Sequence, residues 1–354
     1  MTIPNLAIQF IATTPATPLY DAHPGGFLFG AVKTHSKGDP VQFTKPPLTV
    51  SEQISLLKSR GMHVEDDARA TRVLSHVNYY RLRAYWLPFE ASNDGKSVDG
   101  EHRFKPDTNF DAIVGLYVFD RKLRILLLEA IERVEIALRT HWAQVLADHY
   151  GAHAYLNKTV FGNQQTYDKC LVSLDEELAR SKETFVQHYR SKYTEPVRPP
   201  VWAICELLTL GQLSKWLGNV KLRTDRQAIA HRLNLDEVVL CAFAHHLTHV
   251  RNLCAHHSRV WNRKLTFTMT VPKRPVALAT QFNQAQDRRI YNTLVMLAWC
   301  IKTISPETTW SNRLTILLNS RSEDELRAMG APAGWSERTP WINSNNMLQL
   351  KVPA

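Results

Sequence analysis

One long segment of helical periodicity, residues 110–148, constrains the fold of this chain more than any other feature. Apolar side chains recur there at steps of three and four residues, the spacing that places them on one face of an α-helix. They are Leu116, Phe119, Leu123, Leu126, Ala130, Val134, Ala137 and Leu138. The segment therefore predicts one long amphipathic helix against which the rest of the chain packs.

The opposite face of this predicted helix is charged. It carries Asp120, Arg121, Arg124, Glu132, Arg133, Glu135 and Arg139. Two pairs, Asp120 with Arg124 and Glu135 with Arg139, stand four residues apart, where opposite charges on a helix attract each other. We interpret this face as solvated, and participation in a functional site is the alternative.

Similar patterns elsewhere predict further helices. Ser51 begins a short helix that Gly61 ends, and a second helical stretch runs into residues 78–89. Further helices are predicted at residues 164–193, 201–217, 222–233, 236–263 and 284–303, with Pro196, Pro199 and Pro200 marking one connection. Strand-like alternation occurs only at residues 265–271. The sequence therefore predicts an all-α helical bundle.

Both ends of the chain differ from this helical part. Residues 1–46 are rich in Pro, Gly and Thr and lack helical periodicity, which predicts an irregular N-terminal arm. A helical domain is predicted to span residues 47–345, with a tail at residues 346–354. Because the chain has no run of about 18 apolar residues and no basic residue before its short N-terminal apolar stretch, we expect neither a membrane span nor a signal peptide.

Cysteine usage and net charge indicate a compartment and a class of partner. The five cysteines include no CxxC pair, so neither a zinc ribbon nor a disulfide framework is expected, and a reducing cytoplasm fits. The formal net charge of +10 favours a polyanion, either nucleic acid or an anionic membrane surface. We expect nucleic acid as the partner, and no membrane.

The segment from Asp236 to Lys264 concentrates the chemically active side chains. On a helical wheel, one polar stripe contains His245, His249, Asn252, His256, Arg259 and Arg263. The opposite side contains Phe243, Leu247, Val250, Cys254 and Trp261. Arg251 lies on the flank of the stripe, within reach of His256. His257 points toward the apolar side, so we interpret it as a packed, hydrogen-bonded histidine.

This set of side chains is suited to RNA transesterification. An imidazole can take the 2′-hydroxyl proton or protonate the departing 5′-oxygen, while an arginine neutralises charge that grows on the phosphate. Arg251 and His256 would perform these steps and Asn252 would hold the phosphate or the imidazole. The 2′-hydroxyl is then the nucleophile, so no metal cofactor is needed, DNA is inert and the product ends in a 2′,3′-cyclic phosphate.

Two other interpretations of the stripe remain open. One is a face that is simply solvated, and the other is a metal site formed by His245, His249 and His256. The segment contains no HExxH arrangement and no nearby acidic ligand, which disfavours the metal site.

Four segments resemble the Abi-like family of bacterial abortive-infection proteins, which carry a HEPN domain. They are SEQISLLKSRGM with NYYRLRAYW, LYVFDRKLRILLLEAIERVEIALRT, PPVWAICELLTLGQLSKW, and VRNLCAHHSRVWNRKL. The last segment contains the family's signature, here Arg251, Asn252, Ala255, His256, His257, Trp261, Asn262 and Arg263.

The resemblance implies a fold, an activity and a partner. It implies an all-α domain with a HEPN core at about residues 110–303 and a metal-independent endoribonuclease that acts as a toxin in antiphage defence. It carries over Arg251, Asn252 and His256 as catalytic residues, with His249, His257, Arg259, Arg263, Glu135 and Arg139 as RNA-binding or supporting residues. Because the chain has a single convincing motif, a homodimer is implied. A small RNA partner is also implied, and the alternative function is a non-catalytic protein that holds a structured small RNA.

Overall fold

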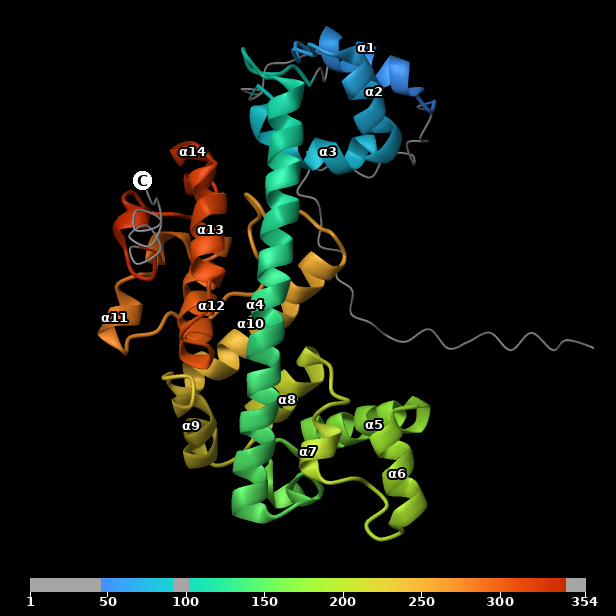
Figure 1. Ribbon diagram of the computed structural model, residues 1–354, viewed down its shortest axis with the longest axis vertical. Helices are drawn as coiled ribbons and strands as arrows, with labels where there is room; N and C mark the ends of the chain where they lie inside the picture. Colours follow the sequence, from blue (N-terminus) through green and yellow to red (C-terminus); the bar gives the residue numbers. More distant parts are fainter. Residues whose placement is uncertain (1–45, 92–101, 342–354) are drawn as a thin grey trace, which may run out of the picture. The chain divides into compact units, whose positions relative to one another are not determined.

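The computed structural model describes residues 46–91 and 102–341 (Figure 1). The chain divides into two units, Met1–Pro46 and Pro47–Ala354. Every element described below belongs to the second unit. The predicted tail at residues 346–354, and the predicted arm at residues 1–46 except Pro46, lie outside the described residues.

Helices form nearly all the regular structure of the described residues. The β-structure there consists of isolated bridges. The predicted all-α fold is confirmed. None of the helices in the described ranges has the length and apolar character needed to cross a membrane. The helices are α1 (Val50–Ser59), α2 (Asp67–His76), α3 (Tyr79–Trp86), α4 (Phe110–Tyr150), α5 (Gln164–Arg180), α6 (Thr184–Lys192), α7 (Val201–Ile204), α8 (Leu210–Asn219), α9 (Arg223–His231), α10 (Glu237–Ala255), α11 (Val276–Ala279), α12 (Ile290–Ile304), α13 (Trp310–Asn319) and α14 (Glu323–Arg327).

The long helix α4 is the element that the others pack against, as the sequence predicts. It contacts α3, α7, α8, α9, α10, α12 and α13. In Figure 1 it is the long green helix, with α10 and α12 beside it. Its first turn is capped by the Asn109 side chain, which accepts hydrogen bonds from the amides of Asp111 and Ala112. It ends at Gly151, whose φ of +84° suits glycine.

Several predicted helices are shorter than expected because local hydrogen bonds interrupt them. The prediction for residues 164–193 is wrong at its middle, where Ser181 is extended and its hydroxyl accepts from the Glu183 amide. The single helix predicted at residues 201–217 is also two helices, α7 and α8, in the structure. There Thr209 and Gln212 form a capping box that starts a new helix, α8.

Asp120 corrects the interpretation of the charged face of α4, because this carboxylate is fully buried. It accepts a hydrogen bond from the Tyr85 hydroxyl at 2.6 Å and one from the Arg124 guanidinium. The backbone amides of Val260 and Trp261 also donate to it, at 3.1 and 2.7 Å. Burial raises the pKa of Asp120, while all four donors favour its ionised form. The pair of Asp120 and Arg124 is therefore a buried junction between α3, α4 and the segment after α10.

We expect Asp120→Asn to lower the free energy of unfolding by about 3 to 5 kcal/mol, because it leaves Arg124 without its buried counterion. Urea denaturation followed by circular dichroism measures the change. The matched control is Asp67→Asn, which removes a surface ion pair with Lys58 and should cost less than about 1 kcal/mol. Equal small effects of the two substitutions would contradict the structural role of Asp120.

Protonation of the buried His246 should lower the stability of the fold at acidic pH. Its buried ring on α10 forms two hydrogen bonds, from Nδ1 to the Phe267 carbonyl and between Nε2 and the Thr293 hydroxyl, both at 2.8 Å. Burial lowers its pKa from 6.5 to about 4. The unfolded chain therefore binds the proton more readily, and stability should fall by up to about 3 kcal/mol as the pH drops from about 6.5 through 4.

Urea unfolding at several pH values tests this expectation. His246→Gln should flatten the pH dependence of the unfolding free energy over that interval. His76→Gln, at an exposed position on α2, should leave it unchanged. A wild-type slope in the His246 variant would contradict the assignment.

Candidate active site at the end of helix α10

Helix α10 ends at Ala255, so the predicted continuation to residue 263 is wrong. His257 adopts a left-handed conformation with φ of +56°. The Ser258 amide donates to the Leu253 carbonyl at 2.8 Å and the His257 amide to the Cys254 carbonyl at 3.1 Å. This pair of bonds is the Schellman pattern that terminates a helix. The two adjacent histidines therefore mark the end of the helix, and His256 is its C-cap.

The residues of the polar stripe share one helical face only as far as the C-cap residue, His256. His245, Asn252 and His256 are exposed, and His249 is half-buried. Arg259 and Arg263 belong to the irregular segment that follows the helix.

The three residues predicted to be catalytic are exposed. Among the described residues, the side chains of Arg251, Asn252 and His256 have no hydrogen bond or ion pair. Arg251 lines an open cleft of about 440 Å³ together with Glu135, Arg139 and Glu206. The structure thus brings Arg251 together with the predicted supporting pair on α4. His256 does not line this cleft.

Arg139 lines this cleft and is held by several hydrogen bonds. Its guanidinium donates to the Glu135 carboxylate and to the backbone carbonyls of Cys205, Glu206 and Leu208. Only 13% of its side chain is exposed. Arg139 therefore ties α4 to the segment between α7 and α8, and Arg251 is the arginine of the cleft that has no partner among the described residues.

Contacts from α3 and α4 position the backbone beyond His256. Arg81 on α3 donates to the His257 carbonyl at 2.7 Å, and Asp120 holds the buried amides of Val260 and Trp261. The His257 ring is exposed, so its interpretation as a packed, hydrogen-bonded histidine is wrong. Its left-handed backbone turns the ring away from the apolar face that a continuous helix would give it.

Two arginines here donate to uncharged oxygens, one from this segment and one from the residue before α12. Arg259 donates to the Ala84 carbonyl, and Arg289 donates to the Asn262 side chain at 2.8 Å. The sequence gives no sign of the role of Arg289, because nothing in the local pattern around it indicates that α12 begins beside Asn262.

His249 is less available for chemistry than its place in the stripe suggests. Its ring packs edge-on against Phe267, with centroids 5.3 Å apart. Its Nε2 atom is buried without a hydrogen-bond partner in the described part of the chain. Burial, followed by the charges of Arg263 and His245, lowers its pKa. The lowered pKa favours the neutral form of the His249 ring.

The metal interpretation of the stripe gains no support from the geometry. In residues 46–91 and 102–341, no three His, Cys, Asp or Glu side chains gather closely enough to hold a metal ion. His245, His249 and His256 are therefore not brought together as a metal site requires.

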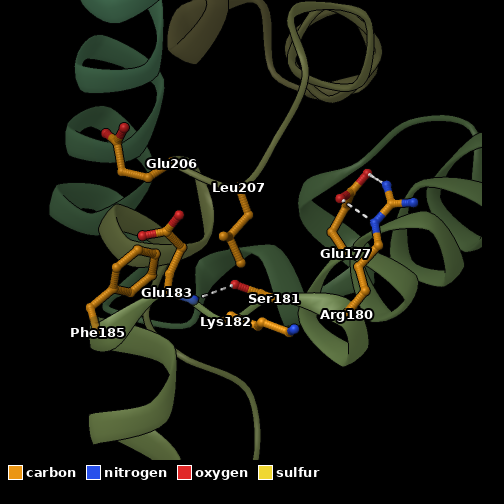
Figure 2. A pocket seen from close by; sticks show the side chains of 8 residues that line it. All are labelled: Glu177, Arg180, Ser181, Lys182, Glu183, Phe185, Glu206 and Leu207. Atoms are coloured by element: carbon orange, nitrogen blue, oxygen red, sulfur yellow. Dashed lines mark hydrogen bonds and ion pairs between the residues drawn. The ribbon is translucent and has the colours of Figure 1, made fainter.

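A second open cleft of about 580 Å³ adjoins the first, since Glu206 lines both. Figure 2 shows Glu206 with Leu207 on one wall, facing the turn between α5 and α6. The charge of Arg180 is neutralised there by Glu177, at 2.9 Å. The sequence singles out none of these side chains, whose mixed charges give no signature of a ligand.

Comparison with known proteins supplies the identity. A family model described as Abi-like protein matches residues 72–262, which is more than half of the chain. Searches of the curated proteins and of the solved structures each found no match. The matched span includes part of α2, all of α4 and the whole of α10 with Arg251 and His256. The chain belongs to the Abi-like protein family.

Proposed function

We propose that this chain is a metal-independent endoribonuclease of the HEPN type that acts as a toxin in abortive infection. Membership of the Abi-like family supports the role in abortive infection. The ribonuclease proposal rests on one observation: Arg251, Asn252 and His256 are exposed and unpaired, within the described residues, at the end of a helix whose following segment is held by the buried carboxylate of Asp120.

The proposed reaction uses the 2′-hydroxyl of the substrate. One imidazole removes its proton, the 2′-oxygen forms a bond to phosphorus, and the bond from phosphorus to the 5′-oxygen breaks. A protonated imidazole gives its proton to the departing 5′-oxygen. Arg251 stabilises the negative charge on the non-bridging oxygens while phosphorus is five-coordinate. The products are a 2′,3′-cyclic phosphate and a 5′-hydroxyl, and no metal takes part.

A second copy of the chain would complete this site. The reaction requires both a base and an acid, and His249 is unsuited to either task because its Nε2 atom is buried. In a homodimer, His256 of each protomer would supply one of the two groups. Exposure of His256 and Arg251 on the surface supports this arrangement, since both side chains are free to meet a partner.

The second candidate function is RNA binding without cleavage. The net charge of +10 favours it as much as it favours catalysis. A shifted but undegraded RNA after long incubation would replace the ribonuclease proposal with this one.

Replacing His256 with Ala should reduce cleavage of single-stranded RNA by at least about 100-fold, because it removes the general acid and base. The measurement is a gel assay with end-labelled RNA and matched DNA in EDTA, with the new ends identified as cyclic phosphates. His245→Ala is the matched control on the same exposed face of α10 and should cleave like the wild type. Undiminished cleavage by the His256 variant would refute its catalytic role.

Replacing Arg251 with Gln should lower the cleavage rate on the order of 100-fold through loss of charge stabilisation in the transition state. Because this side chain lines an open cleft and has no partner among the described residues, the melting temperature should stay unchanged. His257→Ala, run in parallel, should lose far less activity than His256→Ala, because the resemblance gives His257 a supporting role only. If His257→Ala loses as much activity as His256→Ala, the two histidines of one chain would be the acid and the base, and the proposal that a second copy supplies one of them would be refuted.

A further inference from the structure

The aromatic ring of Tyr80 on α3 is exposed, although the aromatic residues around it are packed. Tyr85 and Trp86 on the same helix are buried, and Tyr79 packs edge-on against Trp86, with ring centroids 5.0 Å apart. Tyr80 meets the Tyr79 ring edge-on at 6.1 Å but is 68% exposed, and its hydroxyl makes no hydrogen bond within the described residues. The fold of α3 therefore leaves the Tyr80 ring free to bind a ligand.

The residue after Tyr80 touches the candidate active site directly. The Arg81 guanidinium donates to the His257 carbonyl through Nη1 at 2.7 Å. That bond uses one of the five N–H donors of an arginine. Arg81 is exposed and has no acidic partner in the described part of the chain. Its other donors are therefore available to an anion, beside the residue that follows His256.

A second contact places the same side of α3 against this segment. The Arg259 guanidinium donates to the Ala84 carbonyl. At 100° per residue, Ala84 lies between Tyr80 and Arg81 on the helix surface, about 40° from the first and about 60° from the second. Tyr80, Ala84 and Arg81 thus form one side of α3, and the backbone just after His256 contacts that side.

This arrangement suits one nucleotide of a single strand. A guanidinium donates to phosphate oxygens, and an exposed tyrosine ring stacks on a base. A base can stack on a side chain where it is not paired and stacked within a double helix. A strand bound by both groups is therefore single-stranded at this position.

We propose that Tyr80 and Arg81 bind a nucleotide that flanks the cleaved phosphate, with Arg81 on its own phosphate and Tyr80 against its base. The inference rests on the proposed function, because that function identifies the ligand as RNA. It deepens that function by making the substrate single-stranded. Neither side chain takes part in the proton transfers, and the role of both is binding.

The test of the Tyr80 contact measures binding separately from cleavage. The probe is a fluorescent single-stranded RNA with 2′-O-methyl groups throughout, which keeps every base and phosphate and removes the nucleophile. Its affinity is measured for the wild type, Tyr80→Ala, Tyr80→Phe and Tyr80→Leu. The control is Tyr193→Ala, which removes another exposed tyrosine at the C-cap of α6. The melting temperature of each variant, followed by circular dichroism, verifies the fold.

We expect Tyr80→Ala to bind about tenfold more weakly, which is the order of effect of one stacked base. Tyr80→Phe keeps the ring and should bind like the wild type. Tyr80→Leu keeps an apolar side chain without a ring and should bind as weakly as Tyr80→Ala. Wild-type affinity in Tyr80→Ala or Tyr80→Leu, a loss in Tyr80→Phe, or an equal loss in Tyr193→Ala would each overturn the stacked base.

A second form of the probe identifies the base that stacks. Each nucleotide in turn is replaced by an abasic one, which keeps the phosphate and removes the base. In the wild type, one position should lose about tenfold in affinity, as expected for one stacked base. In Tyr80→Ala the same replacement should cost nothing further, because both changes remove one contact. Additive losses at every position would contradict the contact.

The salt dependence of binding tests the Arg81 contact. Arg81→Gln should bind with a salt dependence that is less steep by about 0.7, the value for one phosphate of a single strand. Arg81→Lys keeps the charge and should retain the wild-type slope. The control is Arg327→Gln, an exposed arginine on α14 that pairs with Asp324 and should also retain it. A wild-type slope in Arg81→Gln would overturn the phosphate contact.

Cleavage of unmodified RNA by the same variants separates this inference from the proposed function. If the wild type cuts RNA, and Tyr80→Ala and Arg81→Gln bind and cut like it, the inference alone fails. If the wild type binds the methylated probe through Tyr80 but never cuts unmodified RNA, the ribonuclease proposal fails and the nucleotide site remains. A wild-type protein that does not bind the probe would overturn both.

Discussion

The arrangement of the site depends on the buried carboxylate of Asp120. Asp120 lies on α4 and accepts hydrogen bonds from the backbone amides of Val260 and Trp261. These two residues follow shortly after the proposed catalytic histidine, His256. An ionised group with no access to water is stable only when donors surround it, and here the donors come from α3, α4 and the segment after α10. The cost of burying this charge thus enforces one position for that segment.

The sequence predicts the helical framework well and the role of Asp120 wrongly, for a physical reason. The periodicity of residues 110–148 depends on neighbouring side chains along one helix, so it identifies α4 nearly to its ends. An acid and a base four residues apart look alike whether the helix faces solvent or protein. Only donors from residues far along the chain, such as Tyr85 and Trp261, distinguish the two cases.

The candidate site also has a part that the sequence predicts and a part that it does not. Helical spacing predicts that Asn252 and His256 share one polar face, and both side chains are exposed in the structure because α10 is regular up to Ala255. Beyond that point the pattern fails, since His257 takes a left-handed conformation that glycine normally marks in a sequence. The neighbourhood of Arg289 and Asn262 arises from packing of α12, which no local pattern encodes.

The contacts that shape the end of α10 join residues far apart in the chain. Asp120 and Trp261 are separated by 141 positions, and Arg81 and His257 by 176. The Trp261 ring further donates to the Glu325 carbonyl, close to the end of the described residues. Contacts of such long sequence separation form late, because a large loop must close first. During synthesis, the α3 and α4 side chains that hold this segment are made before His256, whereas Glu325 follows it, so the full set of contacts around the site forms only after α14 has been made.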